Sequence, residues 1–185
     1  MSLADRRFVL ETERLILREM DQDDFADLCL ILQDGEAMYA YEGALSDVEA
    51  QEWLDRQQER YVRDGFGLWA VVLKQTGEMI GQCGLTWQDV DAHGTRGVEV
   101  GYLFRRAFWH RGFAIEAARA CRDHAFDVLG VERVYSIIRD TNVPSQRVAR
   151  RNGMAIEGSY VKRYRGLDMP HLVFSVSRDA RGGVY

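Results

Sequence analysis

The feature that most constrains this fold is a change of hydrophobic period within residues 98–130. Residues 98–104 form a short apolar run of β-branched and aromatic side chains, which predicts a buried strand. Beyond Gly112 the apolar residues recur at helical spacing, and Gly130 then provides a helix stop. The residues that share this helical face are Ala114, Ala118, Cys121, Ala125, Val128 and Leu129. The sequence therefore predicts a strand that runs into a helix through a short loop rich in Arg and Gly.

The loop between this strand and this helix has the chemistry of an anion site. The first turn of a helix has N–H groups without intrahelical acceptors and a partial positive charge, so a phosphate can bind there. Gly112 has no side chain to separate an anion from these amides. Arg105, Arg106, His110 and Arg111 add positive or titratable groups. The pattern fits a pyrophosphate site, and it fits equally well a packing glycine beside a solvated rim of arginines.

The same stretch resembles a known family. It reads EVGYLF from Glu99 and FWHRGFAIEA from Phe108, which resembles the acyl-CoA-binding signature of the GNAT superfamily of N-acetyltransferases, in the branch that includes the ribosomal-protein-alanine N-acetyltransferases. The superfamily signature is Gln or Arg, two residues, Gly, one residue, then Gly or Ala. Trp109 occupies the first position, and Gly112 and Ala114 keep the last two. His110 stands where the branch usually has another Gly.

This resemblance implies a single α/β (α+β) domain over residues 1–185, with a core at about 12–177. The fold would be a mixed, mostly antiparallel central sheet flanked by helices. Two parallel strands, 98–104 and 134–138, would splay apart and form the acyl-CoA cleft, with the backbone of Leu103 and Phe104 facing the pantetheine arm.

A second segment, NVPSQRVARRNGM from Asn142, resembles the part of the family that supplies an Asn and a Ser beside the pantetheine arm. With the signature loop, it completes the set of cofactor-binding residues that the resemblance implies. These are Leu103, Phe104, Arg105, Trp109, His110, Arg111, Gly112, Phe113, Ala114, Ile115, Asn142 and Ser145.

Hydrophobic period and turn residues predict the remaining elements. Helices are expected after the caps Asp21 and Ser46, the second with Glu49 in a capping box, and within 144–151. Residues 89–97 are expected to form a loop. Further strands are expected at 12–18, 66–73, 79–87, 134–138, 154–163 and 171–176, the last two in a hairpin around 165–168.

Acetyl transfer to an amine requires a neutral nitrogen. A free α-amine, with a pKa of about 7.7–8.0, is roughly a tenth neutral near pH 7, whereas a lysine with a pKa of about 10.4 is far less so. Glu99, thirteen residues before Gly112, is the candidate general base, acting directly or through a water. The alternative is a structural carboxylate paired with an arginine.

The proton donor and the acceptor site are less defined by the sequence. Many relatives have a Tyr at the position of Ala149, so Ser145 is the candidate donor to the thiolate, its alternative being an ordinary first-turn Ser bonded to the backbone. The resemblance places the acceptor wall at the aromatic segment with Tyr39 and Tyr41, which could equally be packed side chains. The acidic residues near it, suited to a cationic acceptor, are Glu36, Glu42 and Asp47.

Composition narrows the class of protein. A net charge of -5 argues against nucleic acid as the main partner. Three cysteines without metal spacing argue against a disulfide framework, and neither they nor the histidines predict a metal site. The sequence has no apolar run long enough for a membrane span and no signal-peptide pattern, so the cytoplasm is the expected compartment, with a monomer or a homodimer as the expected state.

These observations together predict an enzyme that transfers an acetyl group from acetyl-CoA to a primary amine, favouring a protein N-terminal α-amine. A small-molecule amine such as an antibiotic or a polyamine is the alternative acceptor. A CoA-binding sensor without transferase activity is the alternative of another class, because His110 and the missing Tyr depart from the family pattern.

Overall fold

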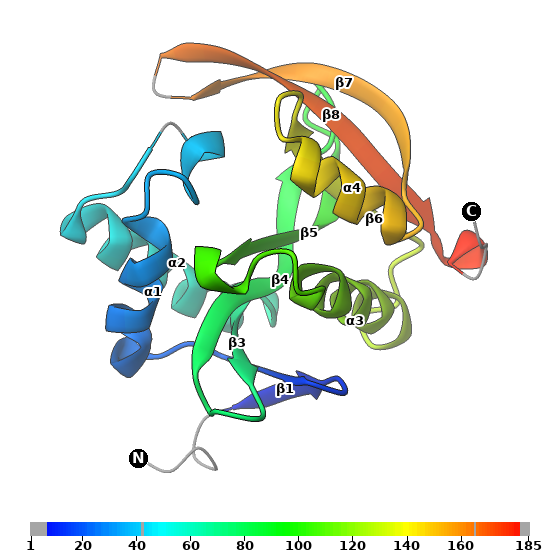
Figure 1. Ribbon diagram of the computed structural model, residues 1–185. Helices are drawn as coiled ribbons and strands as arrows, with labels where there is room; N and C mark the ends of the chain where they lie inside the picture. The colour runs from blue at the N-terminus through cyan, green and yellow to red at the C-terminus, as the bar shows by residue number, and fades with distance from the viewer. Residues whose placement is uncertain (1–6, 42, 165, 182–185) are drawn as a thin grey trace. The chain divides into compact units, whose positions relative to one another are not determined.

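The computed structural model describes residues 7–41, 43–164 and 166–181 (Figure 1). Their backbone contacts group them into two compact units. The first unit contains the described residues up to Gly84 together with Gly101–Ala120. The second contains Leu85–Val100 and the described residues from Cys121 onward.

Within the described residues the strands form one eight-stranded sheet. Its strands are β1 (Phe8–Glu11), β2 (Leu15–Arg18), β3 (Leu68–Leu73), β4 (Met79–Asp89), β5 (Arg96–Phe104), β6 (Arg133–Arg139), β7 (Ala155–Tyr164) and β8 (Leu167–Ser177). They hydrogen-bond in the order β1-β2-β3-β4-β5-β6-β8-β7. The pairings are mostly antiparallel, whereas β5 and β6 run parallel. The mixed, mostly antiparallel α/β fold that the sequence predicts is confirmed.

The first unit has two helices that begin at the predicted caps. Asp21 accepts the amide of Asp23 and caps the 3-10 turn Gln22–Asp24, which leads into α1 (Phe25–Leu32). Ser46 and Glu49 form the predicted capping box at the start of α2 (Asp47–Asp64). The structure adds β1, which the sequence did not predict.

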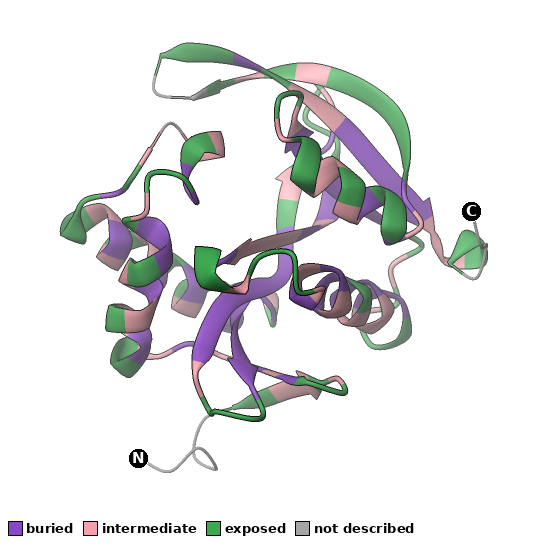
Figure 2. Cartoon of the chain, in the orientation of Figure 1, coloured by how far each residue is buried: buried purple, intermediate pink, exposed green. Residues whose placement is uncertain are grey.

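The core of the first unit lies between these helices and β3. All six residues of β3 are buried, as expected for an apolar strand of β-branched and aromatic side chains (Figure 2). Leu28, Leu32 and Leu54 are fully buried in the same cluster as Val72. Burial of these side chains fixes the amphipathic faces of α1 and α2 against the sheet.

A buried ion pair connects β2 to the start of α1. The guanidinium of Arg18 donates to both carboxylate oxygens of Asp24 at 2.7 and 2.6 Å, and Asp24 also accepts the amide of Asp21 at 3.0 Å. Both side chains of the pair are almost fully buried. Loss of either partner would leave a desolvated charge without compensation.

The second unit is built on β6 and the long hairpin of β7 and β8 (Figure 1). β8 pairs with the whole length of β6, and α4 (Val143–Arg151) follows β6 in the chain. Pro144 stands in the first turn of α4, as the sequence predicts. The predicted turn of the hairpin is too long, because β8 begins at Leu167; Arg165 lies outside the described residues.

The predicted loop at 89–97 is also too long at both ends. β4 continues to Asp89, and β5 already begins at Arg96. Gly97 lies in β5 at a point without room for a side chain, because a Cβ there would lie 2.7 Å from ring atoms of Tyr135. From sequence alone, a strand glycine that makes room for a neighbouring side chain cannot be distinguished from a loop glycine.

We expect Asp24→Asn to lower the free energy of unfolding by about 3–5 kcal/mol, because it leaves the buried guanidinium of Arg18 without its counterion. Urea unfolding would measure the change. Arg63→Gln is the control, since Arg63 pairs with Asp64 at the surface and should leave the midpoint nearly unchanged. Equal behaviour of the two variants would contradict the assigned role of the buried pair.

Candidate functional site

The loop from β5 to α3 (Phe113–Asp127) passes twice through the left-handed region of the backbone. His110 has a φ of 58° and Gly112 a φ of 82°. A side chain costs about 1–2 kcal/mol in this conformation, so Gly is favoured at both positions. This explains why the signature that the sequence resembles usually has Gly where this chain has His110.

Helix α3 begins directly after this bend, close to the predicted start. The amide of Glu116 donates to the carbonyl of Gly112 at 3.2 Å, which is the first bond of the helix. The amides of Phe113, Ala114 and Ile115 precede it and have no acceptor within the helix. The side chains of Phe113 and Ile115 are buried, so these residues can offer a ligand only their backbone N–H groups.

Carboxylates already compensate part of the positive charge of the loop. Arg105 pairs with Glu78 at 2.5 Å. Arg106, in the 3-10 turn Arg106–Phe108, pairs with Asp34 and with Glu36, the latter at 2.8 Å. The sequence predicted a cluster of cations here but could not reveal these distant partners.

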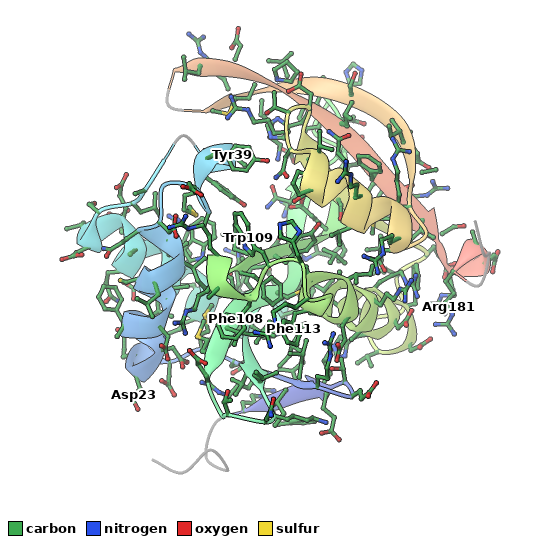
Figure 3. All side chains as sticks on the ribbon, in the orientation of Figure 1. Asp23, Tyr39, Phe108, Trp109, Phe113 and Arg181 are labelled. Atoms are coloured by element: carbon green, nitrogen blue, oxygen red, sulfur yellow. The ribbon has the colours of Figure 1, made fainter. Side chains whose placement is uncertain are left out.

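Arg111 keeps an uncompensated charge as far as the described residues extend, since none of their carboxylates forms an ion pair with it. Its guanidinium lies over two aromatic rings, 5.4 Å from the centroid of Phe108 and 5.3 Å from that of Phe113. Figure 3 shows Phe108, Trp109 and Phe113 gathered around the loop. The rings hold Arg111 beside the first turn of α3 without neutralising it.

Trp109 links the loop to the end of β5. Its indole Nε1 donates to the carbonyl of Phe104 at 2.8 Å, and about a third of the side chain is exposed. The Phe104 carbonyl is therefore already engaged. The pantetheine contacts expected for the backbone of Leu103 and Phe104 stay a prediction, and Phe104 itself is buried.

In the second unit, the parallel ladder of β5 and β6 is short, as the predicted splay requires. Beyond it, side chains replace backbone pairing: the Ser136 hydroxyl donates to the carbonyl of Val100 at 3.0 Å, and the amide of Ile137 donates to Glu99 Oε1 at 2.9 Å. The register pairs of the ladder are Val98 with Val134 and Glu99 with Tyr135.

Glu99 is half-buried on β5, with its carboxylate held by the Ile137 amide. Tyr160 of β7 lies near enough to be affected by it: burial first, then the charges of Glu99 and Asp89, raises the pKa of Tyr160 to about 12. The Tyr160 hydroxyl donates to the carbonyl of Asp89 at 2.6 Å. Tyr160 therefore keeps its proton near neutral pH.

The start of α4 carries the predicted Asn and Ser. Asn142 Oδ1 accepts the amide of Ser145 at 3.1 Å and caps the helix, which leaves its NH₂ group as the one it can present to a ligand. Ser145 is half-buried. Ala149, at the position where many relatives have Tyr, is buried within the unit.

The predicted acceptor wall forms a 3-10 turn, Tyr39–Tyr41. The ring of Tyr41 meets that of Trp53 edge-on, with centroids 5.6 Å apart, so Tyr41 serves packing at least in part. Tyr39 is 39% exposed and remains the residue able to contact an acceptor (Figure 3).

The acidic residues expected near this wall are engaged with other side chains. Glu36 pairs with Arg106, and Asp47 Oδ1 accepts the side-chain amide of Gln33 at 2.5 Å. Glu42 lies outside the described residues. Arg106 therefore compensates part of the charge of Glu36, whereas the neutral amide of Gln33 leaves the charge of Asp47 in place.

The structure thus gathers the predicted residues in two sets. The first unit holds the signature loop and the Tyr39–Tyr41 turn, and the second holds Glu99, Asn142 and Ser145. Sequence reasoning missed contacts made by Thr12, Arg14 and Tyr160, because each of them depends on a partner distant in the chain.

The described part of the chain was searched for metal sites and for membrane-spanning helices. No group of three or more His, Cys, Asp or Glu side chains there is arranged to hold a metal ion. None of the described helices is long and apolar enough to cross a membrane.

Comparison with known sequences identifies relatives over most of the chain. The acetyltransferase (GNAT) domain family matches residues 14–155. A protein named YkkB from Bacillus subtilis (strain 168) is 35% identical over 166 residues, which are 89% of this chain and 93% of that protein. An uncharacterised N-acetyltransferase, p20, from Bacillus licheniformis is 30% identical over 151 residues, 80% of this chain and 83% of that protein.

Solved structures share the fold. An acetyltransferase of the GNAT family from Bacillus anthracis has a TM-score of 0.78 at 19% identity and covers 93% of this chain and 99% of its own. RimL, a ribosomal L7/L12 α-N-protein acetyltransferase in complex with coenzyme A, has a TM-score of 0.75 at 18% identity, covering 94% and 99%. At these identities the likeness concerns the fold.

We expect His110→Gly to keep or raise stability, because Gly adopts the left-handed conformation without strain, and His110→Val to lower the free energy of unfolding by about 1–2 kcal/mol. Urea unfolding of both variants would test this. A Val variant as stable as the Gly variant would mean that residue 110 does not adopt the left-handed conformation in solution.

Proposed function

Since the chain belongs to the GNAT family of N-acetyltransferases, we propose that it transfers an acetyl group from acetyl-CoA to the α-amine of a protein N-terminus. Family membership makes the chain an acyltransferase. The observation that carries the cosubstrate assignment is the start of α3, where three amides without helical acceptors follow the left-handed Gly112.

The diphosphate of acetyl-CoA would bind at this helix start. The amides of Phe113, Ala114 and Ile115 would donate to its oxygens, because the N-terminus of a helix favours an anion. Arg111, whose charge no described carboxylate compensates, would add a charge-assisted contact. His110 lies in the same bend and can contribute a second polar group.

For the pantetheine arm, the first unit offers backbone groups at the end of β5, and the second unit offers the NH₂ group of Asn142. Leu103 and Phe104 are the candidate residues on β5, with the Phe104 carbonyl already taken by Trp109. The side-chain oxygen of Asn142 accepts the backbone amide of Ser145, so the orientation of the Asn142 side-chain amide is fixed before any ligand binds. A fixed donor loses little entropy when it binds.

Glu99 would take the proton of the amine directly or through a water. Its carboxylate is half-buried and oriented by the Ile137 amide, which suits a general base that must stay in one position. The neutral amine then attacks the thioester carbonyl, the tetrahedral intermediate collapses, and the thiolate leaves. Direct attack requires both substrates to be bound at once.

Ser145 is the residue that we propose for protonating the thiolate, directly or through a water. Tyr160 is less suited to this step, because its hydroxyl already donates to the Asp89 carbonyl. Ala149 has no proton to give. A thiol of pKa about 8.5 needs little help to leave as a thiolate near neutral pH, so a weak donor is sufficient.

Two observations favour a protein N-terminus as the acceptor. Glu36 pairs with Arg106, which compensates part of the negative charge that a polycationic small molecule would need. A solved structure with the same fold is that of an α-N-protein acetyltransferase. Exposed Tyr39 would pack against the first side chains of the acceptor.

Thiol release from acetyl-CoA would test the acceptor directly. We expect short peptides with free Ala, Ser or Met N-termini to be acetylated, and matched peptides with a blocked N-terminus and one internal Lys to be inert. Preferred turnover of spermidine or an aminoglycoside would establish the small-molecule alternative. CoA binding without thiol release from any amine would support a sensor.

We expect Glu99→Gln to lower kcat by about 10²–10⁴-fold and to leave the affinity for acetyl-CoA unchanged. Its rate should rise with pH as the amine loses its own proton, with a midpoint at a pH of about 8. Glu132→Gln is the control, because Glu132 is 82% exposed in the same unit and should keep full activity. An unchanged kcat in Glu99→Gln would exclude this residue as the base.

A further inference from the structure

Arg14 joins the turn between β1 and β2 to the first turn of α3, 102 residues later. Its Nε donates to Glu116 Oε2 at 2.7 Å and its Nη2 lies 2.6 Å from the same oxygen. The other oxygen of Glu116 accepts the Thr12 hydroxyl at 2.6 Å and the backbone amide of Arg14 at 3.0 Å. Every oxygen of this carboxylate is therefore bonded within the turn.

The same guanidinium also holds the loop that precedes the helix. Its Nη1 donates to the carbonyl of Arg111 at 3.1 Å, and its Cζ lies 4.3 Å from the ring centroid of Phe113. A Cβ at Gly112 would lie 3.4 Å from Nη2. Arg14 thus touches the three residues at which the chain turns from the loop into α3.

The charge of Glu116 gives this contact a second consequence. Burial alone would raise the pKa of Glu116, but hydrogen bonds from Thr12 and Arg14 together lower it below its ordinary value, so the side chain is an anion near neutral pH. An anion in the first turn of α3 repels a phosphate that binds at the same turn. Arg14 compensates this charge at contact distance.

We propose that Arg14 is a positioning residue for the diphosphate of acetyl-CoA. Its planar guanidinium fixes the loop at 111–113 and neutralises Glu116, so that the first amides of α3 can donate to an anion. This inference rests on the proposed function. Arg14 acts through the loop and touches no reacting atom. Its effect should therefore be confined to the part of the cosubstrate that carries phosphate.

This confinement separates a positioning role from a structural one. Acetyl-pantetheine carries the same thioester as acetyl-CoA but lacks the nucleotide and its diphosphate. Loss of the loop geometry should weaken acetyl-CoA and leave acetyl-pantetheine unaffected. General damage to the fold would weaken both.

The experiment compares KM for acetyl-CoA and for acetyl-pantetheine in the wild type, Arg14→Gln and Arg14→Lys. We expect Arg14→Gln to raise KM for acetyl-CoA about tenfold, with KM for acetyl-pantetheine and kcat unchanged. Arg14→Lys should raise KM for acetyl-CoA as Arg14→Gln does, because an ammonium can pair with Glu116 but cannot hold the Arg111 carbonyl at the same time. Arg7→Gln is the control, since Arg7 pairs with Glu19 at the surface and should change neither constant.

The outcomes distinguish the inference from the function on which it rests. A wild type that uses acetyl-CoA no better than acetyl-pantetheine would reject the diphosphate site itself. A wild type that prefers acetyl-CoA, with the same preference in Arg14→Gln, would reject only the role of Arg14. A wild-type KM for acetyl-CoA in Arg14→Lys would show that a positive charge alone is needed. It would contradict the proposed role of the guanidinium in holding the loop.

Discussion

The unpaired amides at the start of α3 are the constraint on which the account depends. Phe113, Ala114 and Ile115 have buried or half-buried side chains, so their positions are set by the core, yet their N–H groups need an acceptor that the helix cannot supply. Two left-handed residues, His110 and Gly112, precede them in the chain. Membership of the GNAT family is the reason that we propose the diphosphate of acetyl-CoA as their acceptor.

A second constraint acts in the other unit, where a strand pair stops pairing. Beyond the short parallel ladder of β5 and β6, Ser136 and Glu99 use side chains to satisfy backbone groups that a continued ladder would have paired. The amide of Ile137 therefore finds an acceptor in the carboxylate of Glu99, and this bond fixes the orientation of the side chain. The side chain that we propose as the base thus also has a structural role.

Local rules predicted much of this fold. The caps at Asp21 and Ser46, the helix that follows Gly112 and the strand of β3 follow from period and capping, and the resemblance to the GNAT family is confirmed by the family match. Strand ends were less predictable, because the need for glycine at position 97 of β5 comes from the side chains of Tyr135 and Val90 packed against it. The partners of the loop arginines, and the contact of Arg14 with Glu116, were beyond sequence reasoning, since no local pattern tells which carboxylate folds back onto which cation. Site roles that depend on a bound substrate, among them those of Glu99 and Ser145, remain predictions.

Thermal unfolding with and without acetyl-CoA tests the central claim most directly. A ligand that binds only the native state adds about 2.7 kcal/mol at a hundred times its dissociation constant, which shifts the midpoint visibly. Gly112→Ala should lose this shift, whereas Gly130→Ala should keep it, because Gly130 has the same left-handed conformation, with a φ of 72°, beyond the other end of α3. No shift in the wild type, or an equal shift in both variants, would contradict the account of α3 as the diphosphate site.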